Sequence, residues 1–216
     1  MKMIYGSSNE NKVKDIKSII EANGEKWEVI SLKDINFSEE IEENGTTFEE
    51  NSGIKARAVK EFCDKNNIEY DIITTDDAGL CVDCLNGEPG VYSARYTGSH
   101  SASQEEILNK LLKNIKKTGD SERKAKFVCV LTSLLKDGTK IVSRGECQGK
   151  IASKVKKLGG LTYSPVFIPN GYEVPMSELS AEEYEKAHNH RALAFSQLLH
   201  ELKRYNIWND IWNINI

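Results

Sequence analysis

The chain has 216 residues, of which 39% are hydrophobic and 29% charged, a composition that supports a packed core and excludes a disordered protein. Its net charge of −4 provides no basic excess of the kind that nucleic-acid-binding proteins carry, so no nucleic-acid partner is expected. The five cysteines are an odd number, and no apolar run is long enough for a signal peptide or a membrane span, so we expect a cytoplasmic protein with no membrane partner.

Strands and helices alternate along the first part of the chain. Strands are predicted, from apolar and β-branched residues, at residues 1–5, 27–32 and 70–75. Helices are predicted, from capping residues or from apolar residues at helical spacing, after the loop at residues 6–9, from Thr47 to about Phe62, from Ser103, from Ser180 and over residues 193–202. In the second of these helices, the residues expected to face inward are Ile54, Ala58 and Phe62.

A hairpin is predicted in the middle of the chain, where residues 126–136 and 139–149 flank the turn dipeptide Asp137-Gly138. Alternating strands and helices followed by a hairpin indicate an α/β fold with a mixed sheet. No long linker divides the chain, so we treat residues 1–216 as one domain, which could consist of two closely joined lobes. A ligand site is expected where strand ends meet or between the lobes.

A polar loop follows the first predicted strand, where Ser7, Ser8, Asn9 and Lys12 lead into a helix. The N-terminus of a helix offers unpaired N–H groups and a positive dipole end, both of which favour a phosphate. The same residues fit an ordinary N-cap followed by a solvated helical turn. From spacing alone both interpretations stay open.

Two adjacent carboxylates, Asp76 and Asp77, follow the strand predicted at residues 70–75. They could form a solvated acidic turn, or they could hold a hard cation such as Mg²⁺ that brings phosphates with it. The acidic run at residues 39–43 is typical of a solvated loop, although one of its carboxylates could complete a metal site with Asp77. Lys55 lies one helical turn beyond Asn51 and could reach a phosphate or remain exposed.

Two further motifs lack the spacing that a metal site requires. Cys81 and Cys84 have the spacing of half a zinc site, but no second pair follows, so both are interpreted as core thiols. His188 and His190 are two residues apart, and side chains at that spacing do not share a helical face. One histidine together with Arg191 could instead donate hydrogen bonds to a base or a phosphate.

Taken in order, these motifs resemble those of the inosine triphosphate pyrophosphatases, also called XTP/dITP diphosphatases, over nearly the whole chain. The resemblance is carried by Ser7–Lys12, by Glu43–Asn51 (ENGTTFEEN), by Lys55–Arg57 (KAR), by Asp76–Leu80 (DDAGL), by Pro89–Tyr96 (PGVYSARY), and by Gly159, Gly160, Tyr163, Pro165, His190 and Arg191. The segment at 89–96 matches the family almost letter for letter and is the most specific of the set.

The resemblance implies an elongated mixed α/β fold with two lobes around a nucleotide cleft, a homodimer, and Mg²⁺-dependent hydrolysis of ITP, dITP and XTP to the monophosphate, with Mn²⁺ as a possible substitute. It implies that Glu43 and Asp77 bind the metal and that Asp77, with Asp76 beside it, activates the attacking water. The residues it implies for the phosphates are Ser7, Ser8, Asn9, Lys12 and Lys55, and those it implies for the rest of the nucleotide are Ala78, Tyr163, Ser164, Lys186, His190 and Arg191.

The departures from the family pattern gather at the base end. Ala78, Leu161, Thr162, Ser164 and Asn189 stand where the family has serine, phenylalanine, glycine, aspartate and serine, and Lys186 is one position from the family's lysine. A changed base specificity is therefore a second hypothesis, with the same chemistry. A third is a nucleotide-binding protein without turnover, against which the intact Glu43, Asp77, Lys12 and Lys55 speak.

Overall fold

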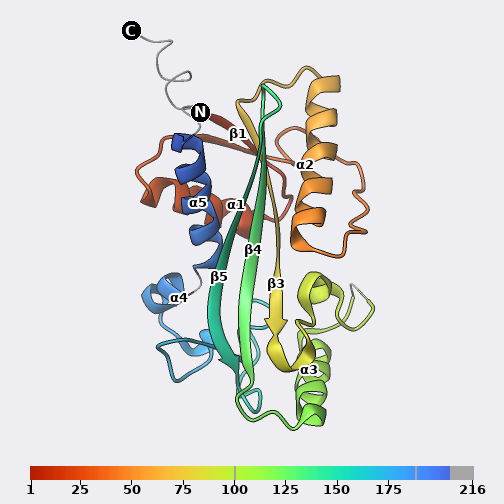
Figure 1. Ribbon diagram of the computed structural model, residues 1–216, viewed down its shortest axis with the longest axis vertical. Coiled ribbons are helices and arrows are strands. Elements are labelled where there is room, and N and C mark those ends of the chain that lie inside the picture. Colours follow the sequence, from red (N-terminus) through yellow and green to blue (C-terminus); the bar gives the residue numbers. More distant parts are fainter. Residues whose placement is uncertain (100, 188, 205–216) are drawn as a thin grey trace. The chain divides into compact units, whose positions relative to one another are not determined.

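The computed structural model describes residues 1–99, 101–187 and 189–204, so the Trp-rich tail at 207–216 lies outside it (Figure 1). The strands are β1 (Lys2–Tyr5), β2 (Glu28–Ser31), β3 (Ile72–Val82), β4 (Lys124–Leu135), β5 (Lys140–Ile151) and β6 (Phe167–Pro169). The α-helices are α1 (Glu10–Ala22), α2 (Phe48–Lys65), α3 (Gln104–Thr118), α4 (Ala181–Ala187) and α5 (His190–Arg204). Short 3-10 turns are η1 (Asp83–Leu85), η2 (Gly90–Arg95) and η3 (Met176–Glu178).

The six strands form one sheet in the order β2-β1-β3-β4-β5-β6. β1 pairs in parallel with β2 and with β3, whereas β5 and β6 run antiparallel. The predicted α/β fold with a mixed sheet is therefore confirmed. The predicted hairpin is also present, because β4 and β5 are joined at Asp137-Gly138 and the Leu135 N–H donates to the Thr139 carbonyl at 2.9 Å.

The chain forms two compact units. The first contains Met1–Asp77, Cys129–Gly145 and the described residues from Arg191 onward, and the second contains Ala78–Val128 and Glu146–His190. That residues 1–216 act as one domain, with a nucleotide cleft between two lobes, stays a prediction. None of the helices among the described residues is both long and apolar enough to cross a membrane.

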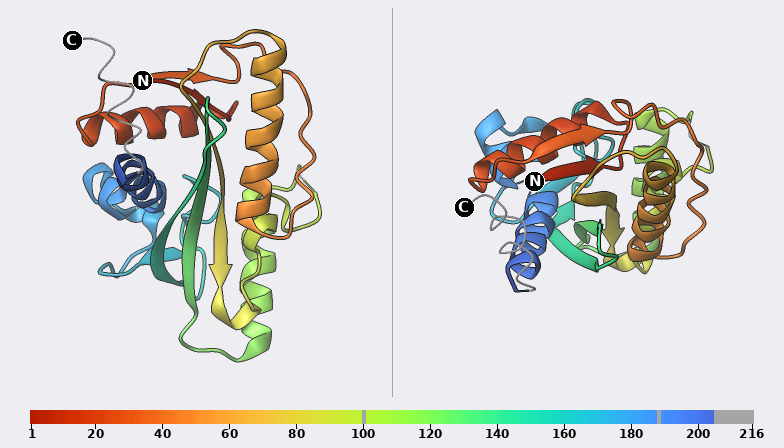
Figure 2. Two further views of the ribbon diagram at one scale, coloured as in Figure 1. Left: turned by 45° about the horizontal axis from the view of Figure 1, so that its top comes forward. Right: turned by 90° about the horizontal axis from the view of Figure 1, so that it is seen from above.

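In the first unit, β1 lies between β2 and β3, so the two helical connections run in opposite directions across the sheet. Connections of this kind are right-handed, which puts α1 and α2 on opposite sides of β1, as Figure 2 shows. Ile4, Val59 and Ile73 form part of the core between α2 and the sheet. Ligands of open α/β sheets bind at the carboxyl ends of strands where the order reverses, which here means the end of β1, where Tyr5 pairs with Thr74 of β3.

Two details of this unit differ from the sequence prediction. The most buried line of α2 contains Ser52, Ala56, Val59 and Cys63, whereas the predicted stripe of Ile54, Ala58 and Phe62 is only partly buried. Ser52 and Ala56 carry little hydrophobic signal, so the pattern of large apolar residues misplaced the inward face. The second difference is that β3 does not end before Asp76 but continues to Val82, because its later residues Leu80 and Val82 are also buried.

The second unit has its own core, to which α3 contributes Ile107, Leu108, Leu111 and Ile115. The predicted capping box that begins α3 is present, with Ser103 and Glu106 exchanging backbone and side-chain hydrogen bonds. The same exchange between Ser180 and Glu183 begins α4. Cys81 and Cys84 form no disulfide among the described residues and are only partly buried, so their interpretation as core thiols is only partly right.

Candidate active site

Asp76 and Asp77 lie at the centre of β3. The sequence had predicted them at the end of a strand, and that prediction is wrong. Successive side chains of a strand point to opposite faces of the sheet. The two carboxylates therefore have different neighbours: Asp76 meets residues of α1 and α5, and Asp77 meets residues of α2. This division gives the two adjacent acids different chemistry.

Asp76 is held in a network of cations with only 2% of its surface exposed. Lys12 Nζ lies 3.0 Å from Asp76 Oδ2, and Arg191 Nη2 donates to the same oxygen at 2.9 Å. Arg191 Nη1 also pairs with Asp15 on α1. Burial opposes ionisation of Asp76, but Lys12, Arg191 and Lys55 outweigh it and hold its pKa well below the usual value. Asp76 is thus a permanently charged anchor, and both of its oxygens are engaged by cations.

Replacing Asp76 by Ala is expected to lower the free energy of unfolding by about 3–5 kcal/mol, because Arg191 would be left buried without its main counter-charge. Urea denaturation followed by circular dichroism measures this as a lower midpoint at unchanged slope. Asp15→Ala is the matched control, since Asp15 is one-third exposed and its loss should cost about 1 kcal/mol or less. Equal urea midpoints for Asp76→Ala and the wild type would show that the ion pairs of Asp76 do not stabilise the fold.

Asp77 lies beside a lysine and a second carboxylate. Lys55 Nζ donates to Asp77 Oδ1 at 3.4 Å and to Glu43 Oε2 at 3.1 Å, so the ammonium lies between the two acids. Asn51 Nδ2 donates to the other oxygen of Asp77 at 3.3 Å. Burial, together with the charge of Glu43, raises the pKa of Asp77 against the opposing effects of Lys55 and Asn51. A carboxylate whose pKa is raised is a better proton acceptor than an ordinary one.

The loop after β1 is organised around Asn9, which is the N-cap of α1. The Asn9 side chain accepts from the N–H groups of Asn11 and Lys12, and Ser7 Oγ accepts from the Asn9 N–H at 3.2 Å. The interpretation as an ordinary N-cap is therefore correct in its geometry. A phosphate role for Ser7, Ser8, Asn9 and Lys12 stays a prediction, and Ser8 and Asn9 are exposed.

The remaining predicted site residues belong to the second unit. Tyr163 is buried and donates to the Ser93 carbonyl at 2.7 Å, and His190 is buried with its ring stacked on Phe127 at 5.5 Å between centroids. Lys186 is exposed and pairs with Glu182 one turn earlier on α4. Ala78 is partly buried, one residue beyond Asp77. Their proposed contacts with a nucleotide stay predictions.

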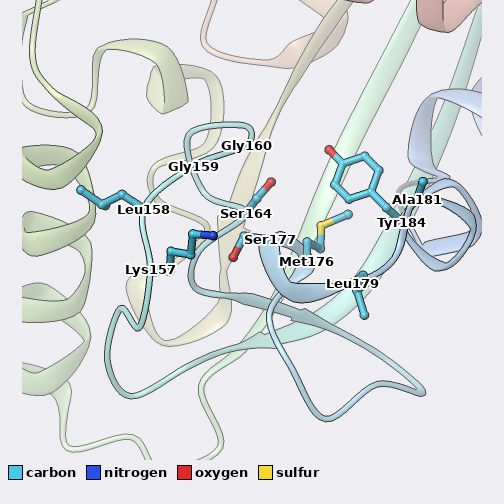
Figure 3. Close-up of a pocket in the computed structure, with 10 residues that line it drawn as sticks. All are labelled: Lys157, Leu158, Gly159, Gly160, Ser164, Met176, Ser177, Leu179, Ala181 and Tyr184. Atoms are coloured by element: carbon cyan, nitrogen blue, oxygen red, sulfur yellow. The ribbon is translucent and has the colours of Figure 1, made fainter.

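Ser164 lines a pocket of about 430 Å³ in the second unit, together with residues that include Gly160, Met176 and Tyr184 (Figure 3). Only 1% of Ser164 is exposed, and its hydroxyl has no hydrogen-bond partner among the residues that the structure describes. Leu161, three residues earlier, is 45% exposed. The hydroxyl and the pocket provide a place where a ligand group could bind.

The donor set around Asp77 fits a magnesium ion bound together with phosphates. No group of three or more His, Cys, Asp or Glu side chains is arranged to hold a metal within residues 1–99, 101–187 and 189–204. Mg²⁺, however, usually takes only one or two carboxylates and completes its shell with water and substrate phosphates. Glu43 and Asp77, which already share one cationic group, supply that number of ligands.

Two residues of the Asp76 network were not found from the sequence. Asp15, which pairs with Arg191, lies 176 positions away from it in the chain and is one of several charged residues on an ordinary amphipathic helix. Tyr5 is fully buried, and burial with the nearby Asp76 raises its pKa well above the usual value, so the phenol stays neutral. A tyrosine in an apolar strand reads as a core residue, so no local signal marks it.

Comparison with known proteins identifies the family. The profile described as the Ham1 family matches residues 3–201. The chain belongs to the Ham1 family. The dITP/XTP pyrophosphatase of Clostridium perfringens is 37% identical over 202 residues, which cover 94% of this chain and 97% of the relative. The enzyme of the same name from Bacillus subtilis is 40% identical over 196 residues, which cover 90% and 93% of the two chains.

Solved structures of Ham1 proteins share the fold. The Staphylococcus aureus Ham1 protein superposes with a TM-score of 0.78 at 32% identity, covering 95% of this chain and 100% of that one. The nucleoside-triphosphatase / dITP/XTP pyrophosphatase of Mycobacterium abscessus gives a TM-score of 0.72 at 34% identity, covering 92% and 99%. The family named from the motifs at residues 7–12, 43–51, 76–80 and 89–96 is therefore confirmed.

Proposed function

We propose that this Ham1 protein hydrolyses dITP, XTP and ITP to the monophosphate and pyrophosphate, with Mg²⁺ or Mn²⁺ as the cation. The relatives named dITP/XTP pyrophosphatase support the reaction and the substrate class. The observation that carries the proposal in this chain is the arrangement of Glu43 and Asp77 around the Lys55 ammonium. Two acids that share a cation provide a place for a metal, and the lysine is available for a phosphate.

Different residues of the first unit are proposed to bind the cation, to accept the proton and to bind the phosphates. Glu43 and Asp77 would hold the divalent cation, which neutralises the triphosphate and the pyrophosphate that leaves. Asp77 is also the group proposed to accept the proton of the water that attacks the α-phosphorus. Lys55 and Lys12 bind phosphate oxygens, and Ser7, Ser8 and Asn9 offer further donors at the start of α1. Asp76 fixes Lys12 and Arg191 in place and takes no part in proton transfer.

The residues proposed to recognise the base are Tyr163, Ser164, Lys186 and His190, together with Ala78 and Arg191. His190 is proposed to donate to a carbonyl-bearing purine, and Arg191, whose Nη atoms pair with Asp15 and Asp76, would donate to it through Nε. Tyr163, Ala78 and Lys186 lie at neighbouring positions of the family pattern. Ser164, whose hydroxyl has no partner in the described part of the chain, stands where the family has a carboxylate. Leu161 presents an exposed aliphatic side chain where the family has an aromatic ring.

A reduced preference between bases is expected from these two replacements. The lost aromatic surface is worth about 1 kcal/mol of stacking, which corresponds to about a 5-fold change in kcat/KM. Pyrophosphate release from ITP, XTP, GTP, ATP and a pyrimidine triphosphate is measured at one Mg²⁺ concentration, first for the wild type and then for Leu161→Phe with Ser164→Asp. The double variant should favour ITP and XTP over GTP more strongly than the wild type does. Equal selectivity in the two proteins would contradict this prediction.

The same panel separates the competing functions. Release of pyrophosphate from ITP and XTP supports the proposed enzyme, whereas release only from another nucleotide supports the alternative of a changed base. Binding of nucleotide without any release would favour the third hypothesis, a protein that binds without turnover. The presence of Glu43, Asp77, Lys12 and Lys55 together favours an enzyme, because a binding protein does not need both metal-binding carboxylates.

We also propose a homodimer that resides in the cytoplasm. Tyr92 is exposed with the Arg95 guanidinium over its ring, and aromatic and arginine side chains are enriched at interfaces. The five cysteines form no disulfide within the described part of the chain, which fits a reducing compartment. Sedimentation at micromolar concentration should give twice the 24.3 kDa mass of one chain. A monomer in that experiment, or recovery of the protein outside the cytoplasm on fractionation, would contradict the respective statement.

A further inference from the structure

Asn51 joins two parts of the candidate site. It lies in the first turns of α2 and is 1% exposed, so both ends of its side-chain amide need partners within the protein. Its Oδ1 accepts from the Gly45 N–H at 2.9 Å, and its Nδ2 donates to Asp77 Oδ2 at 3.3 Å. The backbone N–H of Gly45 can only donate, which fixes the amide orientation and directs the NH₂ group towards Asp77.

The contact with Gly45 is close enough to exclude a side chain there. A Cβ at position 45 would lie 2.7 Å from Asn51 Oδ1 and 3.1 Å from the Asn51 nitrogen. The following residues are bound to the same helix end, because Glu50 Oε2 accepts from the N–H groups of Thr46 and Thr47 at 2.6 and 3.1 Å. The segment that begins two residues after Glu43 is therefore pressed onto the N-terminus of α2.

We propose that Asn51 is a positioning residue, which fixes Asp77 directly and Glu43 through Gly45, so that the two carboxylates face one divalent cation. This inference rests on the proposed function. Asn51 donates to Oδ2 of Asp77, so the amide holds the carboxylate by one oxygen and leaves Oδ1 to Lys55, which also donates to Glu43. Hydrogen bonds of this kind behind a ligating carboxylate fix its orientation, and their loss costs about 10–100-fold in metal affinity.

The test is direct binding of Mn²⁺, measured from the electron paramagnetic resonance signal of the free ion without any turnover. Asn51→Leu keeps the volume but removes both hydrogen bonds, and Asn51→Ala is a second variant in case the first does not fold. We expect both to bind Mn²⁺ about 10–100-fold more weakly than the wild type. In pyrophosphate release, kcat should fall by a similar factor, while the KM for the nucleotide changes less.

Ser52→Ala is the matched control. Ser52 is the next residue of α2 and is also fully buried, and its hydroxyl bonds with Thr132 at 2.8 Å, so its loss removes a buried hydrogen bond away from the carboxylates. Its Mn²⁺ affinity should equal that of the wild type. Unchanged Mn²⁺ affinity in the Asn51 variants, or an equal loss in Ser52→Ala, would overturn the positioning role alone. A wild-type protein that binds no Mn²⁺ would overturn both this role and the metal dependence proposed above.

Discussion

Replacing Asp77 by Asn is expected to lower kcat for pyrophosphate release by about 10³-fold, a loss typical of a missing general base. Asn has the same shape, so the fold should tolerate it, but it carries no charge for the cation and cannot accept a proton from water. Steady-state kinetics with ITP or XTP at saturating Mg²⁺ measure the effect.

Two other variants serve as comparisons for Asp77→Asn. Lys12→Ala should act largely through KM, because Lys12 is proposed to bind a phosphate and not to take part in proton transfer. Glu42→Gln removes one charge from the exposed side of the same acidic segment, next to Glu43, and should leave both constants near those of the wild type. A kcat for Asp77→Asn within about 10-fold of the wild-type value would assign the proton transfer to another group.

Removal of the divalent cation is expected to abolish turnover. Without the cation, the negative charges of Glu43, Asp77 and the triphosphate repel one another. The single positive charge of Lys55 cannot offset this repulsion. Excess EDTA should lower pyrophosphate release by about 10³-fold or more, and added Mg²⁺ or Mn²⁺ should restore it. Ca²⁺ is larger and prefers more ligands, so it should restore less. Full activity in excess EDTA would contradict a metal-dependent reaction.

Local signals predicted much of the architecture. The capping boxes at Thr47, Ser103 and Ser180 each begin a helix, and the turn at Asp137-Gly138 joins β4 to β5. These signals work because they depend on residues within a few positions of one another. The inward face of α2 was misplaced because Ser52 is buried through a hydrogen bond with Thr132, 80 residues away, and no hydrophobic pattern records such a contact.

The sequence pointed to several residues that lie together in the candidate site, but it did not predict the hydrogen bonds and ion pairs between them. The motifs led to Glu43, Lys55 and Asp77, which the structure brings together within hydrogen-bonding distance. Because Asp76 and Asp77 were expected after the end of a strand, the sequence did not predict that their side chains point to opposite faces of β3. This alternation places Asp76 among buried cations and Asp77 beside Lys55, which also contacts Glu43. The partners that define the anchor, Asp15 and Arg191, depend on how distant helices pack, which spacing alone does not reveal.

Between turnovers, the ammonium of Lys55 is the counter-ion of Glu43 and Asp77. The positive charge of Lys55 offsets the repulsion between the two carboxylates when no divalent ion is bound. The carboxylates can therefore stay close together without being protonated. An arriving Mg²⁺ has to displace that charge, which weakens its binding to the protein alone. A nucleotide offers Lys55 a new anionic partner, so ion and nucleotide should each bind more tightly when the other is present. The protein would then bind its metal weakly by itself and more tightly together with a substrate.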